Sequence, residues 1–324
     1  MKIIFQILII LMLVSCTKEK PQTEQYEHTQ ISAVPLSAPS LTDRETFLRL
    51  LDELAEIERT GTWLQGMAIR ESGIRENAGD YAGAVAAAYK ELAFAYGRGL
   101  ILKEDIEKGL LNLLETKNDD SVVYAAGAII AFEKGQWADA LSGLEKLFNL
   151  SDEPDSFTSW MLLVCALENS LGQEDRRVSA AYKSIRARYA QFPEYWYRGA
   201  RAFSGAVAAG FAENCINLAV QGPFAGECRK ILASYCGLKP EDSLLIKTKM
   251  EIEAVFTESI KTENPKLLEP LLPLISLPEN PYTVYATGVL RSLTTVQAFR
   301  DYLATQAALS SGRLAERLSY ICRS

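Results

Sequence analysis

Histidine is almost absent from this chain, since a single one, His28, occurs in 324 residues. It lies in a polar stretch with no helical period, so the part of the chain expected to fold contains no histidine. This absence excludes Ser-His-Asp and Cys-His nucleophilic mechanisms from the folded part. No Cys-X-X-Cys pair and no Cys/His spacing typical of zinc sites occurs either. We therefore expect no metal and no cofactor.

Basic residues are also fewer than acidic ones. The chain has 34 lysines and arginines against 41 acidic residues, which gives a formal net charge of −7. Proteins that bind nucleic acids present an excess of basic residues, so we expect no nucleic-acid partner. A basic run does occur between Arg176 and Arg201. It has two interpretations: a solvated helix face, or a patch for an acidic partner or an anionic lipid or glycan group.

Long apolar runs are missing as well. The run from Ile3 to Val14 is too short to span a bilayer comfortably, and it lies between Lys2 and the pair Ser15-Cys16. A basic start, a short apolar stretch and a small residue before the cut are typical of a secretory signal. A second apolar stretch, LLPLISL at residues 271–277, could dip into a membrane but is too short and proline-broken to cross one.

The sequence Leu-Val-Ser-Cys at residues 13–16 resembles the lipobox of bacterial lipoproteins. The resemblance implies that residues 1–15 are a signal peptide and that Cys16 becomes a lipidated N-terminus, with acyl chains such as palmitate anchoring it to a membrane. An ordinary cleaved signal with a stray cysteine is the alternative. Thr17 stands where an aspartate would retain such a protein at the inner membrane, so we expect the outer membrane, facing the periplasm. The polar composition of residues 16–40 predicts the lipidated cysteine and a disordered tether.

Five further cysteines follow the tether, and their number is odd. In an oxidising compartment an odd count leaves at least one thiol unpaired in a monomer. The sequence leaves their pairing open, and most of them are expected to be buried as small hydrophobic side chains. They are Cys165, Cys215, Cys228, Cys236 and Cys322.

No segment has the pattern of a strand-rich sheet, and the apolar spacing is helical, so we predict an all-α fold. Residues 41–78 are expected to form an N-terminal helical cap that begins with a helix over 41–58, capped by Thr42 and Asp43. A C-terminal helical region is expected over residues 224–324. Its predicted parts are one long helix from Pro240 through Phe256, short or broken helices over 264–281, and two or three helices from 281 to 322.

Four large rings recur every 35 or 36 residues, at Tyr89, Tyr124, Trp160 and Trp196. Residues four and seven positions after each ring share a helical face with it. We therefore predict four helices with one contact stripe each. The accompanying stripe residues are Ala93, Ala128, Val164 and Ala200, and then Tyr96, Ala131, Leu167 and Phe203.

This stripe is similar to the first-helix signature of tetratricopeptide repeats. The sequence EKGQWADAL at 133–141, with a turn at Gly135, is similar to the turn and second helix of the same family. The resemblance implies an α-solenoid of tetratricopeptide-like (TPR-like) helical pairs over residues 79–223, with atypical helical caps at both ends. It also implies that Trp196 packs between helices. The phase of the helical pair around Tyr89 stays open.

In the tetratricopeptide family the first helices line a concave groove, and the inward side chains lie one and five positions after the ring. For this chain the resemblance implies a groove with an apolar floor and a basic residue at each end. Such a groove suits an amphipathic protein segment or an extended ligand with an acidic group. The alternative is that helices fill the groove and bury these side chains. The groove residues are Lys90, Phe94, Ile129, Met161, Cys165, Tyr197 and Arg201, and Phe132, eight positions after Tyr124, joins them.

The sequence ESGIRENAGDYAGA at 71–84 resembles the first motif of lytic transglycosylases. In that family a glutamate acts as general acid and base on a glycosidic bond, and needs no histidine. The later Gly-Leu-Met-Gln of the family is Ala-Ala-Ala-Tyr at 86–89 here, and no Tyr-Asn-Ala-Gly follows. The resemblance provides an alternative function, a peptidoglycan enzyme that uses Glu71. The matching residues are Glu71, Ser72, Ala78, Gly83 and Ala84.

The sequence as a whole favours a lipid-anchored periplasmic binding or scaffold module that is not an enzyme. It is expected to hold a protein partner or an extended ligand, as an accessory to envelope assembly or solute transport, or to bind another copy of itself.

Overall fold

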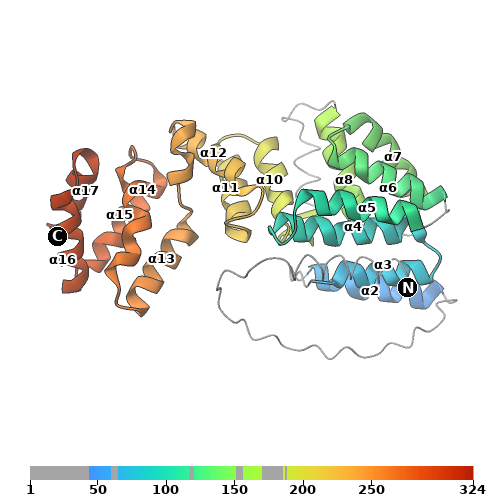
Figure 1. Ribbon diagram of the computed structural model, residues 1–324, viewed down its shortest axis with the longest axis horizontal. Helices are drawn as coiled ribbons and strands as arrows, with labels where there is room; N and C mark the ends of the chain where they lie inside the picture. Colours follow the sequence, from blue (N-terminus) through green and yellow to red (C-terminus); the bar gives the residue numbers. More distant parts are fainter. Residues whose placement is uncertain are drawn as a thin grey trace. The chain divides into compact units, whose positions relative to one another are not determined.

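The computed structural model describes residues 44–59, 65–116, 120–150, 156–169, 185–186 and 188–323. Within these ranges the chain forms α-helices and short 3-10 helices and no strand (Figure 1), which confirms the predicted all-α fold. The predicted signal peptide, Cys16 and tether lie outside the described residues. None of the described helices is both long enough and apolar enough to cross a membrane.

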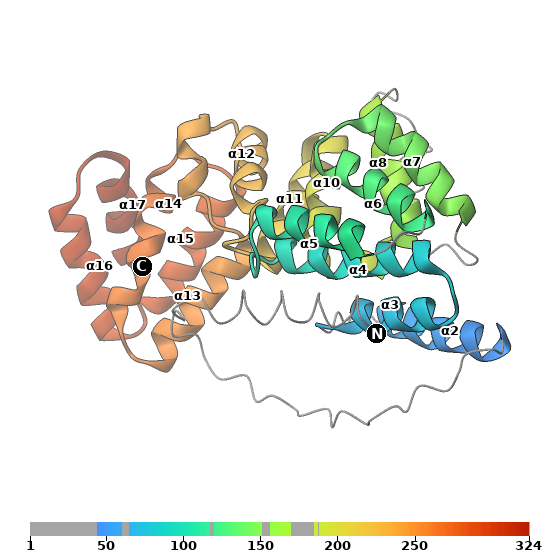
Figure 2. The same ribbon diagram turned by 45° about the vertical axis from the view of Figure 1, so that its right-hand side comes forward.

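The chain divides into two compact units, Met1–Phe192 (unit 1) and Pro193–Ser324 (unit 2). The boundary falls inside residues 79–223, the range predicted to form one block of repeats, so this range is divided between the two units. In unit 1 neighbouring helices pack as pairs, α3 with α4, α6 with α7 and α7 with α8 (Figure 2). The described part of unit 1 includes α2 (Arg44–Arg59), α3 (Met67–Asn77), α4 (Tyr81–Gly97), α5 (Lys103–Thr116), α6 (Asp120–Glu133), α7 (Trp137–Leu150) and α8 (Ser156–Asn169).

Helix α4 forms the centre of unit 1. Its alanine-rich sequence is buried along almost its whole length, and it contacts α3, α5, α6, α7 and α8. Small side chains let so many neighbours approach closely. Near its C-terminal end the ring of Phe94 lies 4.6 Å from that of Phe192 and 6.0 Å from that of Phe157. The ring of Phe157 is in turn stacked on Trp160 at 5.3 Å. This ring cluster is part of the buried core of unit 1.

The turn predicted at Gly135 is confirmed, because α6 ends at Glu133 and α7 begins at Trp137. Gly135 has a φ of 69°, a left-handed conformation that glycine adopts at little steric cost. The predicted stripe is only partly correct in this pair. Ala128 and Ala131 are buried, but Tyr124 is 50% exposed. The buried face of α6 is instead broad, and it includes the residues one position after those of the predicted stripe.

Unit 2 continues as short helices, and α10 packs on α11, α11 on α12 and α16 on α17. Three helices follow Pro281, in agreement with the prediction. The elements of unit 2 are α10 (Pro193–Ala202), α11 (Gly205–Leu218), α12 (Ala225–Tyr235), η1 (Pro240–Leu245), α13 (Lys249–Lys261), η2 (Pro265–Leu271), α14 (Leu272–Ser276), α15 (Pro281–Leu293), α16 (Gln297–Leu309) and α17 (Gly312–Cys322).

The single long helix predicted from Pro240 through Phe256 is wrong. A 3-10 helix ends at Leu245, Ile246 is extended with a ψ of 133°, and α13 begins after Thr248. The Thr248 side chain accepts from the backbone N–H of Glu251, and the Glu251 side chain accepts from that of Thr248. This capping box starts a new helix where the apolar spacing suggested continuation.

The predicted break over residues 264–281 is confirmed, since the segment forms η2 and α14. The apolar stretch that it contains is not a surface feature of unit 2. Leu271, Leu274 and Ile275 are fully buried, and Leu277 is 4% exposed. These side chains pack in the core of unit 2, which leaves no apolar face for the alternative of a membrane-dipping segment.

Candidate functional site

Six of the eight predicted groove residues belong to unit 1, and all six are buried there. The ring of Phe132 lies 5.8 Å from that of Trp137 and 6.0 Å from that of Trp160, inside the core. The expectation of an open groove is corrected at these positions, where the alternative of buried side chains holds. The physical reason is that α4, α6 and α8 are covered on more than one side. The six residues, each between 0% and 5% exposed, are Lys90, Phe94, Ile129, Phe132, Met161 and Cys165.

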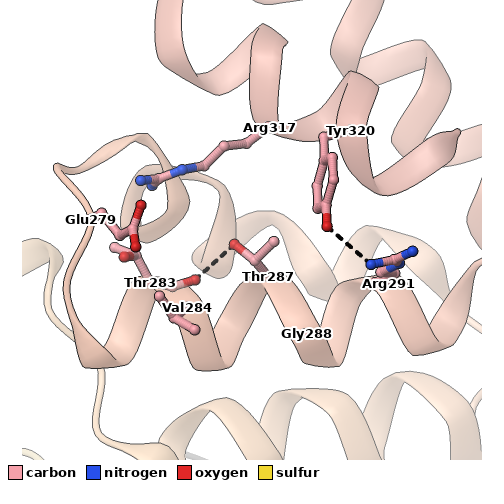
Figure 3. A pocket seen from close by; sticks show the side chains of 8 residues that line it. All are labelled: Glu279, Thr283, Val284, Thr287, Gly288, Arg291, Arg317 and Tyr320. Atoms are coloured by element: carbon pink, nitrogen blue, oxygen red, sulfur yellow. Dashed lines mark hydrogen bonds between the residues drawn. The ribbon is translucent and has the colours of Figure 1, made fainter. Parts of the chain in front are cut away.

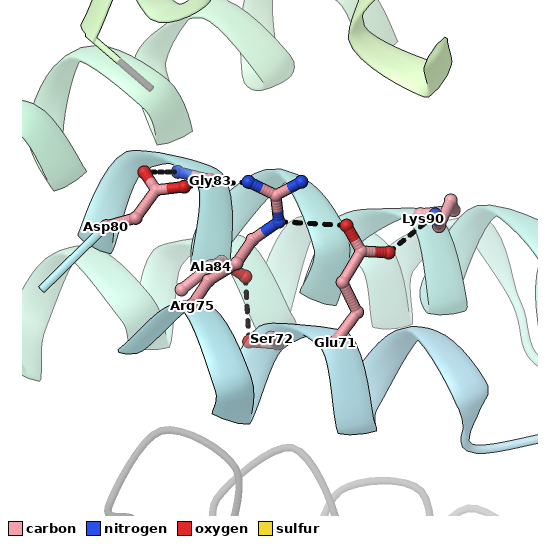
Figure 4. A network of polar contacts seen from close by, with 7 residues as sticks. All are labelled: Glu71, Ser72, Arg75, Asp80, Gly83, Ala84 and Lys90. Atoms are coloured by element: carbon pink, nitrogen blue, oxygen red, sulfur yellow. Dashed lines mark hydrogen bonds and ion pairs between the residues drawn. The ribbon is translucent and has the colours of Figure 1, made fainter. Parts of the chain in front are cut away.

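Lys90 belongs to a buried network of charges between α3 and α4 (Figure 4). Its Nζ lies 2.8 Å from Oε2 of Glu71, and Nε of Arg75 lies 2.8 Å from Oε1 of the same carboxylate. Arg75 also pairs with Asp80, with Nη1 and Oδ2 2.7 Å apart. Each side chain in the network is at most 8% exposed. Two cations and two anions therefore balance inside unit 1.

The network accounts for the small residues of the motif at 71–84. The hydroxyl of Ser72 donates to the carbonyl of Ala84 at 2.7 Å, so α3 lies close against α4. A Cβ on Gly83 would lie 2.2 Å from Oδ2 of Asp80 and 2.7 Å from Nη1 of Arg75. The position needs glycine because the ion pair passes directly over it. Packing and the ion network thus account for Glu71, Ser72, Gly83 and Ala84 of the transglycosylase-like motif.

Glu71 does not have the environment that the enzymatic alternative requires. A general acid must present a proton to a substrate at an accessible oxygen. Both carboxylate oxygens of Glu71 already accept from buried cations, Arg75 and Lys90, and the residue is 6% exposed. The geometry is that of a structural ion network.

Glu91, the neighbour of Lys90, is a buried carboxylate that the sequence analysis missed. Its two oxygens accept the backbone N–H groups of Gly66 and Ala68, at 2.9 and 3.2 Å, at the start of α3. Burial raises the pKa of the Glu91 carboxyl, while the two hydrogen bonds and the charge of Lys90 act in the opposite direction. Glu91 therefore caps α3 from α4, a role that sequence spacing does not reveal.

The remaining two groove residues lie on α10 of unit 2, and both are accessible. Tyr197 is half-buried and Arg201 is exposed. The ring of Tyr197 is stacked on Phe224 at 4.8 Å with an interplanar angle of 16°, and the Arg201 guanidinium carbon lies 5.9 Å from the Tyr197 ring. We call Tyr197, Arg201 and Phe224 the α10 cluster. Phe224 lies between α11 and α12, outside the helices to which the repeat spacing applies, so that spacing does not predict its contact with Tyr197.

The opposite face of α10 is packed, as predicted. Trp196 is 5% and Ala200 2% exposed, and the Trp196 ring lies 5.2 Å from that of Phe211 on α11. Phe203 is half-buried, with its ring 5.3 Å from that of Phe211. The helical offsets therefore separated packing residues from accessible ones correctly on this helix.

The basic run from Arg176 to Arg201 is described only in part. Arg176, Arg177 and Lys183 lie outside the described residues. Arg186 is exposed, whereas Arg198 pairs with the buried Glu194 at 3.0 Å. The run is thus not one uniform solvated face.

Within the described ranges, none of the five cysteines forms a disulfide with another. The neighbouring Cys228 thiol and burial in unit 2 both raise the pKa of the Cys215 thiol. In the described part of the chain, no group of three or more His, Cys, Asp or Glu side chains is arranged to hold a metal ion.

Comparisons of the chain with models of protein families, with curated proteins and with solved structures find no match. A role for the protein must therefore be argued from its own residues. Of the predicted site residues, Tyr197 and Arg201 are the two that the structure places together at an accessible surface.

Proposed function

We propose that this chain is a lipid-anchored binding module of the cell envelope that holds a protein segment or an extended ligand on a helical surface. In this proposal Cys16 carries the anchor, residues 16–40 form the tether, and the helical units are a scaffold without catalysis. Packed neighbouring helix pairs support the proposal, because repeats of such pairs commonly present binding surfaces. Oligomers of the chain itself are included, since a second copy can supply the bound segment.

The observation that carries the proposal is the α10 cluster. The Tyr197 ring is held by its stack on Phe224, so little conformational entropy is lost when a partner covers it. Arg201 places a cation beside that ring. Tyrosine and arginine are among the residues that most often dominate binding energy at interfaces. The cluster suits a partner with an apolar side chain next to an acidic group.

The peptidoglycan enzyme is not retained as a second candidate. Its proposed acid, Glu71, is enclosed by Arg75 and Lys90 inside unit 1. No observation on the described residues favours it.

Co-purification from the native envelope tests the proposed function. We expect a partner to be recovered with the wild-type lipoprotein and lost with the double variant Tyr197→Ala, Arg201→Glu. The matched control is Lys239→Glu, which makes the same charge change at a lysine whose side chain is 78% exposed. Equal recovery with all three proteins, each with wild-type helical content, would show that the α10 cluster is not the binding surface.

A further inference from the structure

Unit 2 contains a cavity of about 440 Å³ between α15 and α17. Helix α15 contributes Thr283, Thr287 and Arg291, which lie four residues apart and so share one face (Figure 3). Helix α17 contributes Arg317 and Tyr320. The volume falls in the range of pockets that bind small ligands. From sequence this region is expected only to form an atypical helical cap.

One end of the cavity offers hydrogen-bond donors. Nη1 of Arg291 donates to the hydroxyl of Tyr320 at 3.0 Å, and the guanidinium carbon lies 5.2 Å from the centre of the tyrosine ring. This contact places Arg291 beside Tyr320 at this end of the cavity. A guanidinium has five N–H groups, so the contact leaves most of them to a ligand. A planar carboxylate is the group that such a fork binds best.

The other end offers acceptors. The Thr287 hydroxyl donates to the carbonyl of Thr283 at 2.7 Å, and the Thr283 hydroxyl donates to that of Asn280 at 2.9 Å. Both hydroxyls therefore donate to backbone carbonyls. The lone pairs of the Thr287 oxygen remain as acceptors for a ligand. Glu279 adds a carboxylate in the turn before α15. A ligand with N–H groups fits this end.

Arg317 lies beside the acceptor end and is fixed by the backbone. Its Nη1 donates to the carbonyl of Ile275 and, at 2.7 Å, to that of Leu277. In Figure 3 its guanidinium reaches toward Glu279. Burial lowers the pKa of Arg317, the nearby charge of Arg313 lowers it further, and Glu279 raises it. The partly desolvated Arg317 guanidinium is thus a donor for a carbonyl oxygen of a ligand.

We propose that this cavity binds a short peptide with free ends, its carboxylate on Arg291 and its ammonium group near Glu279. From Thr283 to Arg291 the helix rises about 12 Å, at 1.5 Å per residue. An extended peptide advances about 3.3–3.6 Å per residue, so roughly two to four residues fill this length. The proposal is independent of the lipid anchor and of the α10 cluster, and it adds a small-molecule site to the proposed scaffold.

Isothermal titration of the full-length protein in detergent with trialanine tests the proposal. Trialanine has both terminal charges and no polar side chain. We expect saturable binding of trialanine, and a loss of at least about tenfold in affinity when the probe is N-acetylated or C-amidated. An absence of binding at millimolar trialanine would overturn the proposal. Equal affinity for the free and the blocked probes would also overturn it.

A larger side chain in place of Gly288 would fill the cavity without replacing any charged residue. Gly288 lies on the cavity wall in α15, and a Cβ added there meets no atom within 4 Å. We expect Gly288→Leu to abolish trialanine binding while helical content is kept. Gly226→Leu in α12 is the matched control, because Gly226 is exposed and its added Cβ also meets nothing. Wild-type affinity in Gly288→Leu would place the peptide elsewhere.

Discussion

Glu71 on α3 and Lys90 on α4 meet in the interior of unit 1, with Oε2 and Nζ 2.8 Å apart. Their side chains are 8% and 1% exposed. Buried charges are costly to desolvate, and the ion pair between Glu71 and Lys90 offsets part of that cost for each of them. The pair therefore fixes the position of α3 against α4. Loss of the pair should lower the free energy of unfolding of unit 1.

Lys90→Met should destabilise unit 1 strongly. The change leaves the Glu71 carboxylate with Arg75 alone, and removal of one partner from a buried pair costs about 3–5 kcal/mol. Chemical denaturation followed by circular dichroism measures the loss. The control is Arg49→Met, which removes the partner of Glu53 from a pair whose side chains are 61% and 54% exposed, and should cost about 0–1 kcal/mol. Equal costs in the two variants would contradict the account of the network.

Gly143→Ala should loosen the pair formed by α6 and α7. A Cβ at Gly143 would lie 2.6 Å from Cβ and 3.1 Å from Cα of Ala128, so one helix must move. Overpacking of this kind costs about 1–3 kcal/mol. Gly127→Ala on α6 is the control, because its Cβ meets nothing within 4 Å, and it should stabilise by about 0.5–1 kcal/mol. Melting temperatures that shift in the same direction for both variants would show that the close crossing is absent.

Titration of Glu91 should make the stability of unit 1 depend on pH. Burial is the largest influence and raises the carboxyl pKa above its ordinary value of 4.5. The folded protein then binds this proton more tightly than the unfolded chain does. The resulting stabilisation is fully present below pH 4.5 and is lost as the pH rises through the raised pKa.

Glu91→Gln isolates this effect, because the amide does not titrate. We expect the free energy of unfolding of the wild type, minus that of the variant, to decrease as the pH is raised from about 4 toward neutrality. Urea denaturation at a series of pH values measures the difference. A difference that increases with pH would mean that the hydrogen bonds from Gly66 and Ala68 outweigh burial.

Cys16→Ser should release the protein from the membrane. If Cys16 carries the only anchor, the variant loses its lipid while the helical units are unchanged. Fractionation of cells followed by immunoblotting, with circular dichroism of the released protein, provides the measurement. A variant that stays with the membrane and resists salt extraction would show that another segment holds it there.

The helices were predictable from sequence wherever apolar spacing and local breakers agree. Gly135 marks the turn between α6 and α7, and the prolines of residues 264–281 interrupt the helices there. The break before α13 was missed because the apolar spacing continues through Ile246. Only the capping box of Thr248 and Glu251 reveals the new start.

The site was less predictable than the fold. Helical offsets identify the accessible face of α10 because that helix has one packed side. The same offsets fail on α4 and α6, which are covered by several neighbours, so Lys90 and Phe132 are interior. Contacts between residues far apart in sequence, such as Tyr197 with Phe224, depend on how the helices pack and leave no periodic signal.

Site-specific photo-crosslinking in living cells shows whether the chain binds a partner through the α10 cluster. A photoreactive residue replaces Arg201 in one strain and Lys239 in another, and both side chains are exposed. We expect a discrete higher-mass adduct at position 201 that disappears when Tyr197→Ala is added, and no such adduct at position 239. No adduct at position 201, or the same adduct at both positions, would contradict binding through the α10 cluster.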